Sequence, residues 1–409
     1  MNPLFIGIDV SSKNNVVCLL MPDGEKHSSF SVQNSLDGAK ILSRKVVSAL
    51  AQANLDSIVI GMESTSVYGD HLVYFLREDY GLSSFNKKVH VLNAKQVDKF
   101  KESYPDLPKT DDVDAFVIAD YLRFGRINKE VYMDDYRYKA LQNLTRARFF
   151  AVQNLTKEKQ RFLNFLFLKF SNMATDNVFS NTFGATSIAV IEEFLSVDDV
   201  VNMDFDNLLD FIKTKGRNRF DDPAAVAKAL QAAARGSYRL PKTINDSVNQ
   251  VLSIMVSSIR ALETQISAFD KAITQQIQLI PNTLGSVKGI GPVFTAGLIA
   301  EIGDIKRFDN QAALAKYAGL AWTRHQSGSF EAQNTKLIRS GNRYLRYYFI
   351  EAANSVRRCN SEYARFYGLK YKEVNKFQHK RALALTARKL VRLVFSLLKT
   401  NRLYIPSDK

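Results

Sequence analysis

Cysteine is scarce in this chain of 409 residues, and the two that occur, Cys18 and Cys359, are far apart. So distant a pair provides neither a disulfide framework nor the clustered thiols of a zinc site, so we expect a reducing, cytoplasmic environment. Long apolar runs are also missing, because none approaches the roughly 18 uncharged residues of a membrane span. The start, MNPLFIGIDV, lacks the basic segment and small-residue cleavage site of a signal peptide. We therefore expect no membrane partner.

Acidic residues are outnumbered by basic ones, 41 against 56, which gives a net charge of +15. The excess is concentrated near the end, where residues 336–402 hold seventeen Lys and Arg but three acids, a net charge of +14. Aromatic residues are interleaved with these Lys and Arg residues. Basic side chains bind phosphates and aromatic rings stack on bases, so this stretch predicts a nucleic-acid partner. A solvated basic face over an aromatic core is the alternative interpretation.

Two apolar runs in the first part of the chain end in acidic residues. Residues 4–10 carry Asp9 near their end, and residues 57–63 end in Glu63. Three predicted strands over residues 4–32, followed by alternating helices and strands, are typical of an α/β sheet. Functional groups of such sheets cluster where strands end. We therefore expect Asp9 and Glu63 to lie close together.

Two further acids, Asp111 and Asp114, open a helix predicted over residues 111–124. Their i, i+3 spacing places both carboxylates on one helix face. Thr110 or Asp111 can be the N-cap, and acids in a first turn favour the helix dipole, which is a purely structural interpretation. Together with the two strand-end acids, however, they make four carboxylates that repel one another unless a cation neutralises them. Such ligands suit Mg²⁺ or Mn²⁺, and carboxylate-held metal pairs recur in phosphodiester cleavage.

Long helices are predicted from about residue 136 onward. Apolar residues recur at spacings of three and four over residues 136–166 and 244–279, which predicts an antiparallel helical hairpin or a self-association coil. Residues 170–243 are less regular and are interpreted as a small helical insertion without an assigned function. We expect three domains, comprising residues 1–130, 131–280 and 281–409.

The C-terminal part carries two further motifs. Residues 282–304 place a Gly-Ile-Gly turn before a small-residue helix, which is typical of a helix-hairpin-helix that holds a DNA phosphate, although an ordinary tight turn also fits. Ser327 precedes Gly328 in a polar loop and is a candidate nucleophile, although Ser-Gly is also common in turns. The nucleic-acid contacts that we expect are Lys288, Gly289, Gly291, Arg324, Lys336, Arg339, Arg343 and Arg346.

The segments FIGIDVSSK, GMES, KTDDVDA, SVKGIGPVFTAGLIAEIGD, YAGL, SGS and RSGNRYLR, in this order, resemble the DEDD transposases of the insertion sequence 110 family. The resemblance implies an α/β RNase H-like (RuvC-like) domain, then long coiled-coil helices and a mainly α C-terminal domain with a helix-hairpin-helix. It implies that the four acids named above, without Asp112, hold a divalent metal ion. It also implies that Ser327, not Ser329, is the catalytic serine.

The family is one of bridge-RNA-guided recombinases, so the resemblance implies a serine-linked exchange of DNA strands. The serine oxygen would attack a DNA phosphate, and a free 3′-hydroxyl would then attack the phosphoserine. A noncoding guide RNA would select donor and target DNA, and acids and serine would come from different copies in a homodimer or homotetramer. The expected location is the prokaryotic cytoplasm, at the nucleoid. The alternatives are a RuvC-type, junction-resolving endonuclease without serine chemistry, and an inactive RNA-binding scaffold.

Overall fold

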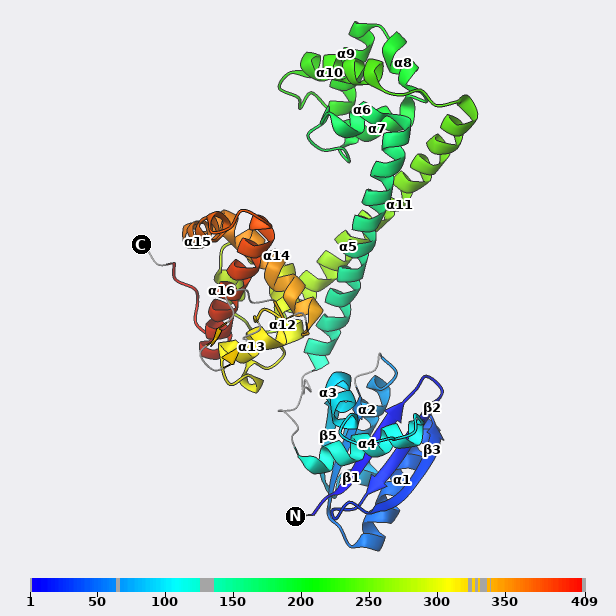
Figure 1. Cartoon of the computed structure of the whole chain (residues 1–409), viewed down its shortest axis with the longest axis vertical. Helices are drawn as coiled ribbons and strands as arrows, with labels where there is room; N and C mark the ends of the chain where they lie inside the picture. The colour runs from blue at the N-terminus through cyan, green and yellow to red at the C-terminus, as the bar shows by residue number, and fades with distance from the viewer. Residues whose placement is uncertain are drawn as a thin grey trace. The chain divides into compact units, whose positions relative to one another are not determined.

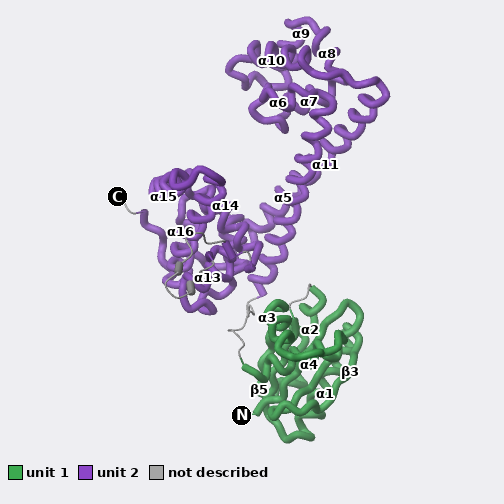
Figure 2. The backbone as a smooth tube through the Cα atoms, in the orientation of Figure 1, with its two compact units in different colours: residues 1–134 green, residues 135–409 purple. Residues whose placement is uncertain are grey.

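The computed structural model describes residues 2–63, 67–125, 136–322, 326–327, 330–331, 337–338 and 340–406. The chain forms two compact units, Met1–Asp134 and Asp135–Lys409 (Figure 2). The first is a mixed α/β unit and the second is built mainly from helices (Figure 1). This confirms the predicted fold at that level, while the RNase H-like class and the three-domain division stay predictions. Within the described ranges, none of the helices combines the length and apolar character of a membrane-spanning segment.

The first unit contains one sheet with helices on both faces. Its strands are β1 (Leu4–Val10), β2 (Asn14–Leu20), β3 (Lys26–Gln33), β4 (Ser57–Glu63) and β5 (Asn86–Leu92). Its helices are α1 (Leu36–Ala53), α2 (Asp70–Glu78), α3 (Ala94–Lys101) and α4 (Asp111–Phe124), with a 3₁₀ turn η1 (Tyr80–Leu82). Among the described residues the strand order is β3-β2-β1-β4-β5, with β1 antiparallel to β2 and parallel to β4.

Side chains of β1 alternate between the two faces of the sheet, as the pleat requires. Leu4, Ile6 and Ile8 join the apolar core that includes α1 and α2. Phe5 joins the core on the opposite face, which α3 and α4 cover. Gly7 lies on that second face, where a Cβ would stand 2.0 Å from the backbone carbonyl oxygen of Ala115 in α4. Glycine therefore lets α4 pack directly on the strand.

We expect Gly7→Ala to destabilise the first unit by about 1–3 kcal/mol or more, because the added Cβ overlaps the α4 backbone. Hydrogen–deuterium exchange of the β1 and β4 amides in the full chain measures the loss. Gly69→Ala is the matched control, since a Cβ there would meet the Met62 sulfur at 3.4 Å, an ordinary contact. Equal protection in the two variants would contradict this account.

In the second unit, two long helices pack against each other, α5 (Tyr136–Lys169) and α11 (Lys242–Ile277). Arg148 pairs with Asp270, and further along α5 the Nζ of Lys159 lies 2.7 Å from Glu263 Oε1. The partner numbers fall as the α5 numbers rise, so the helices are antiparallel. Of the two predicted alternatives, the structure thus contains the antiparallel helical hairpin. Self-association through these helices stays a prediction.

The residues between α5 and α11 form the predicted helical insertion at the end of the hairpin (Figure 1). Phe162 and Leu166 of α5 and Leu252 of α11 share an apolar core with it. The hairpin and the insertion are therefore packed together. The insertion consists of α6 (Ser171–Thr175), α7 (Ala185–Glu193), α8 (Val197–Asn202), α9 (Phe205–Gly216) and α10 (Pro223–Gly236).

The rest of the second unit is a helical bundle into which the other end of the hairpin packs. Leu141 of α5 and Ile277 of α11 are part of its core, and the buried Tyr348 donates its hydroxyl to the Thr145 carbonyl at 2.7 Å. The bundle consists of η2 (Leu284–Ser286), α12 (Pro292–Ile302), η3 (Ile305–Arg307), α13 (Gln311–Tyr317), the strands β6 (Gln326–Ser327) and β7 (Phe330–Glu331), α14 (Arg343–Cys359), α15 (Ser361–Lys372) and α16 (Gln378–Thr400).

Candidate carboxylate site and serine loop

Asp9 and Glu63 lie at neighbouring strand ends, on the face of the sheet that α4 covers. The parallel register of β1 and β4 brings the two residues to the same edge. Asp9 is two residues after Gly7, and Glu63 is two residues after Gly61, so each shares the face of a glycine. Both glycines are positions at which α4 packs closely on the sheet. The alternation of the strands therefore turns both acids toward this helix.

The first turn of α4 contains Asp111 and Asp114. Thr110 is the N-cap, and its hydroxyl accepts a hydrogen bond from the Val113 N–H at 3.3 Å. The contact of α4 with Gly7 holds the helix across β1, near the strand end that carries the other acids. The same helix start is therefore capped by Thr110 and carries two of the four acids. The N-cap interpretation and the metal-site interpretation of this segment do not exclude each other.

The electrostatics of the four acids reflect their proximity. Burial raises the pKa of Asp9, and the charges of Asp111 and Asp114 raise it further. Burial likewise raises the pKa of Glu63 to about 7, with additional repulsion from Asp98, Asp9 and Asp114. A cation bound among these carboxylates would relieve that repulsion.

Two residues of α3 adjoin the cluster, and the sequence reasoning did not identify them. Asp98 adds a fifth carboxylate near Glu63. Lys101 Nζ donates a hydrogen bond to Asp114 Oδ1 at 2.5 Å, and its charge lowers the pKa of both Asp9 and Glu63. Their i, i+3 spacing predicts a shared helix face, but no local pattern indicates that this face meets the sheet edge.

The cluster fits a divalent cation in its charge and in its donor atoms. Carboxylate oxygens are the ligands that Mg²⁺ and Mn²⁺ prefer. Lys101, paired with Asp114, offsets only part of the negative charge of the four acids. Among the residues that the structure describes, no three Asp, Glu, His or Cys side chains are grouped closely enough to hold a metal ion as they stand. Metal binding by the four acids stays a prediction.

Asp112, the acid between the two site residues of α4, is directed to another partner. Lys26 Nζ lies 2.8 Å from its Oδ2, and the Ser29 hydroxyl also donates to it. These two hydrogen bonds lower the pKa of Asp112. Asp112 therefore links α4 to β3 and provides a matched comparison for its neighbours.

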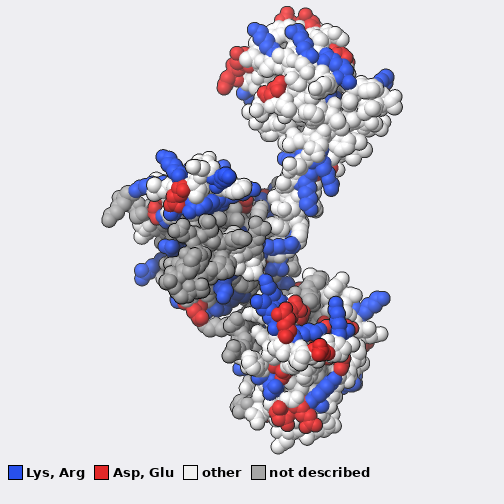
Figure 3. All heavy atoms as spheres, in the orientation of Figure 1, with Lys and Arg blue, Asp and Glu red and all other residues white. Residues whose placement is uncertain are grey.

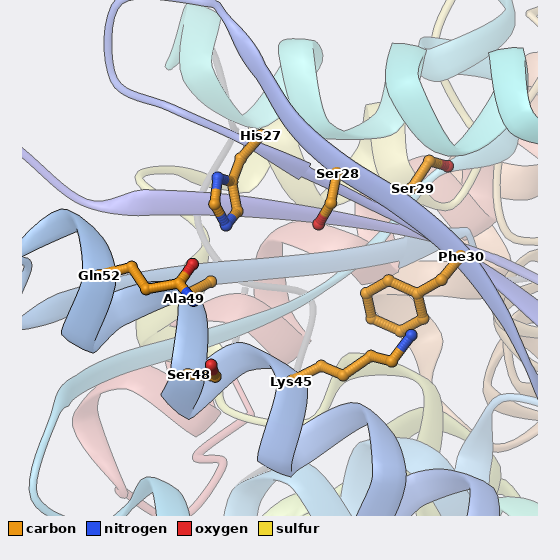
Figure 4. A pocket seen from close by; sticks show the side chains of 8 residues that line it. All are labelled: His27, Ser28, Ser29, Phe30, Lys45, Ser48, Ala49 and Gln52. Atoms are coloured by element: carbon orange, nitrogen blue, oxygen red, sulfur yellow. The ribbon is translucent and has the colours of Figure 1, made fainter.

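A pocket of about 210 Å³ opens between β3 and α1 (Figure 4). Lys45 extends along it, with Nζ 4.1 Å from the centre of the Phe30 ring. None of its lining residues is acidic, so this pocket is separate from the carboxylate cluster. The lining residues are His27, Ser28, Ser29, Phe30, Lys45, Ser48, Ala49 and Gln52.

Ser327 lies in the short strand β6 of the second unit, which pairs with β7. The chain on either side of this strand pair comes together. The Ile338 N–H donates to the Ala321 carbonyl at 2.8 Å, and Trp322 pairs with Leu337 in an antiparallel bridge. Ser327 therefore belongs to a loop, residues 322–337, that is closed at its base.

Three of the predicted nucleic-acid contacts surround the turn before α12. Lys288 is exposed, and Gly291 is the N-cap of α12, with nothing within 4 Å of the position a Cβ would take. Gly289 has a φ of 103°, and a Cβ there would stand 2.8 Å from the Val356 Cα in α14. Because the element before the turn is the 3₁₀ turn η2, the helix-hairpin-helix stays a prediction.

Two more of these residues, Arg343 and Arg346, lie in α14. The Arg343 guanidinium is 4.8 Å from the centre of the Tyr344 ring. Arg346 lies beside Gly319, near the base of the Ser327 loop. A Cβ added to Gly319 would stand 2.3 Å from Nη1 of Arg346. The remaining three lie outside the described residues, namely Arg324, Lys336 and Arg339.

Charge is distributed unevenly over the face of the molecule drawn in Figure 3. Lys and Arg side chains gather along the hairpin of α5 and α11, whereas side chains of both signs cover α6 to α10. Basic surfaces of this kind attract the phosphates of nucleic acids.

Comparisons with known proteins agree with the family suggested by the motifs. A family model described as "Transposase", of the DEDD type of IS110, matches residues 6–170. A second, described as "Transposase IS116/IS110/IS902 family", matches residues 282–368. Between them the two matches include the four acids and Ser327.

Curated relatives include two proteins of bacterial insertion elements and a probable transposase. An uncharacterized protein of insertion element IS116 of Streptomyces clavuligerus is 26% identical over 337 residues, which cover 80% of each chain. An uncharacterized protein of insertion element IS110 of Streptomyces coelicolor is 26% identical over 46% of this chain and 51% of its own. A probable family 20 transposase of Pseudomonas aeruginosa is 26% identical over 29% of this chain and 36% of its own. The chain belongs to the IS110 family of transposases.

Proposed function

We propose that this transposase cuts and rejoins DNA strands through a covalent serine–DNA intermediate, with RNA selecting the sites. The observation that supports the proposal is that Asp9 and Glu63 lie at neighbouring strand ends and face α4, whose first turn carries Asp111 and Asp114, in a chain of a transposase family. In this proposal Asp9, Glu63, Asp111 and Asp114 bind Mg²⁺ or Mn²⁺ in a RuvC-like domain of residues 1–130. Residues 131–280 form the coiled-coil part, and residues 281–409 supply the serine.

In the proposed reaction the Ser327 Oγ attacks a DNA phosphate. An Oγ–P bond forms, the bond from phosphorus to the 3′-oxygen breaks, and the 3′-oxygen leaves with a proton. A divalent cation, when bound, stabilises the negative charge of the phosphate and of the leaving oxygen. A free 3′-hydroxyl of another strand then attacks the phosphoserine, which restores Ser327 and rejoins the DNA. The chain's own part is to present the serine and to hold the four carboxylates at one edge.

The proposed partners are double-stranded donor and target DNA and a noncoding guide RNA. The basic C-terminal stretch supports this, since residues 336–402 carry nearly the whole charge excess of the chain. Among the basic residues of this stretch that the structure describes, Arg343 and Arg346 lie nearest in sequence to Ser327. We further propose a homodimer or homotetramer in which different copies supply the acids and the serine.

Purification of the full chain from cells that carry the gene with its flanking DNA tests the RNA partner. We expect one structured noncoding RNA, transcribed from that flanking DNA, to copurify with the protein through high-salt washes. Its loops should be complementary to the insertion site. Recovery of bulk cellular RNA alone, without enrichment of the flanking transcript, would show that RNA guidance is wrong.

The alternative, a RuvC-type endonuclease, would cleave DNA without forming a covalent serine–DNA intermediate. A plasmid that carries the gene and its flanking DNA is incubated with the purified complex and Mg²⁺, and the products are separated under denaturing conditions. We expect a DNA strand that remains attached to protein until protease is added. Strand cleavage without such an adduct would favour the endonuclease.

A further inference from the structure

Glu301, near the end of α12, is a carboxylate whose side chain is fully buried. Arg146 of α5 binds it with two nitrogens, Nε at 2.7 Å and Nη2 at 2.9 Å. Gln142, one turn earlier on α5, donates to Glu301 Oε2 at 3.4 Å. A buried carboxylate is tolerated when it is paired and hydrogen-bonded in this way, so α12 and α5 depend on each other here.

Asn342 connects this ion pair to the polypeptide that leaves the Ser327 loop. Its Nδ2 donates to Glu301 Oε2 at 2.6 Å. Its Oδ1 accepts the N–H groups of Tyr344 and Leu345, both at 3.0 Å, which makes it the N-cap of α14. Its own N–H donates to the Tyr317 carbonyl in α13 at 2.7 Å. One residue, through its side chain and its backbone N–H, therefore joins α12, α13 and α14 at this point.

The two arms of the Ser327 loop lie side by side next to Asn342. A Cβ on Gly341 would stand 2.6 Å from the Gly319 nitrogen and 2.8 Å from the Tyr317 carbonyl oxygen, so only glycine allows this approach. Gly319 itself has a φ of 67°, a conformation that favours glycine. Beyond these glycines the arms are joined by the hydrogen bond between Ile338 and Ala321. The base of the loop is thus held together next to the hydrogen-bonded network of Arg146, Glu301 and Asn342.

We infer that Arg146, Glu301 and Asn342 are positioning residues that fix the base of the Ser327 loop to the long helix α5. This inference rests on the serine chemistry proposed above. Asn342 keeps its place because Glu301 accepts its side-chain N–H, and Glu301 keeps its place because Arg146 pairs with it. The Arg146 guanidinium also lies 4.5 Å from the centre of the Tyr344 ring, so the first turn of α14 is held from the same side. Loss of one member frees the base of the loop.

Hydrogen–deuterium exchange of the free, full-length protein tests this placement without nucleic acid. We expect Glu301→Ala and Asn342→Ala to speed exchange of the backbone amides of Ile338 and of position 342 by about tenfold or more. Glu301→Gln should speed it less, because its amide oxygen still accepts from Asn342. Asp270→Asn is the matched control, since it removes the acidic partner of Arg148, which lies two residues after Arg146 on α5. No acceleration in the Glu301 variants, or equal acceleration in the control, would overturn the inference.

Adduct formation on the plasmid that carries the gene and its flanking DNA supplies the second readout. We expect Glu301→Gln to lower the rate at saturating DNA by about tenfold, with the half-saturating DNA concentration unchanged within about twofold. Glu301→Ala should be slower still, and Asp270→Asn should match the unsubstituted chain. A rate that falls only in step with DNA binding, or equally in the control, would assign these residues a merely structural role.

The two proposals fail in different ways. If the unsubstituted chain cleaves the plasmid but forms no serine adduct, the serine chemistry is wrong. The exchange experiment then still decides whether the network fixes the loop base.

Discussion

We expect Ser327→Ala to abolish the covalent protein–DNA adduct and to lower strand cleavage by about 10³-fold or more, because no other group replaces the attacking oxygen. DNA binding should be unchanged, since the substitution removes one hydroxyl and leaves the basic C-terminal stretch intact. Denaturing electrophoresis with and without protease measures the adduct, and fluorescence anisotropy on the same DNA measures binding.

Ser329→Ala is the matched control for that experiment, because it removes the same atom two residues further along the same loop. It should form the adduct at the rate of the unsubstituted chain. If Ser329→Ala rather than Ser327→Ala removes the adduct, the serine assignment is wrong by two residues. If both variants cleave fully and the unsubstituted chain forms no adduct, the RuvC-type endonuclease replaces the recombinase.

The second large effect concerns the carboxylates. We expect Asp111→Asn to lower strand cleavage by about 10³-fold or more at saturating Mg²⁺, because an amide does not supply the anionic oxygen that the cation requires. Asp9→Asn should do the same. Nucleic-acid binding should survive in both variants. Cleavage of the plasmid over a range of Mg²⁺ and Mn²⁺ concentrations, and its arrest by chelator, measures the effect.

The structure supplies a control within the same helix turn. Asp112→Asn removes an equal charge next to Asp111, but Asp112 is bonded to Lys26 and Ser29. It should retain cleavage, because it stands outside the cluster of mutually repelling acids. Since Asp111 raises the pKa of Asp9, Asp111→Asn relieves repulsion and should leave the folded chain at least as stable. Unchanged recombination in cells with Asp111→Asn would favour the inactive RNA-binding scaffold.

Some of these features follow from local sequence patterns alone. The two-residue period of β1 separates Leu4 and Ile6 from Asp9, so the strand by itself determines that the acid faces away from that core. The polar pair Thr110 and Asp111 predicts the start of the acidic helix, and the structure has its cap at Thr110. The long repeats of three and four predict the two helices of the hairpin. Each of these patterns depends on neighbours within a few residues, which is the range over which sequence periodicity carries information.

Other features depended on tertiary packing. Lys101 and Asp98 join the carboxylate cluster because α3 packs at the same edge of the sheet as the strand ends, and nothing in their own spacing indicates this. Glu301 is bonded to Arg146 across 155 residues of chain and to Asn342 across 41. A buried carboxylate must be paired because its desolvation is costly, and the packing of distant segments sets which donor lies close enough to pair with it. Local patterns therefore predict the strands, the capped helix and the candidate acids, whereas long-range packing sets which charged side chains pair with one another.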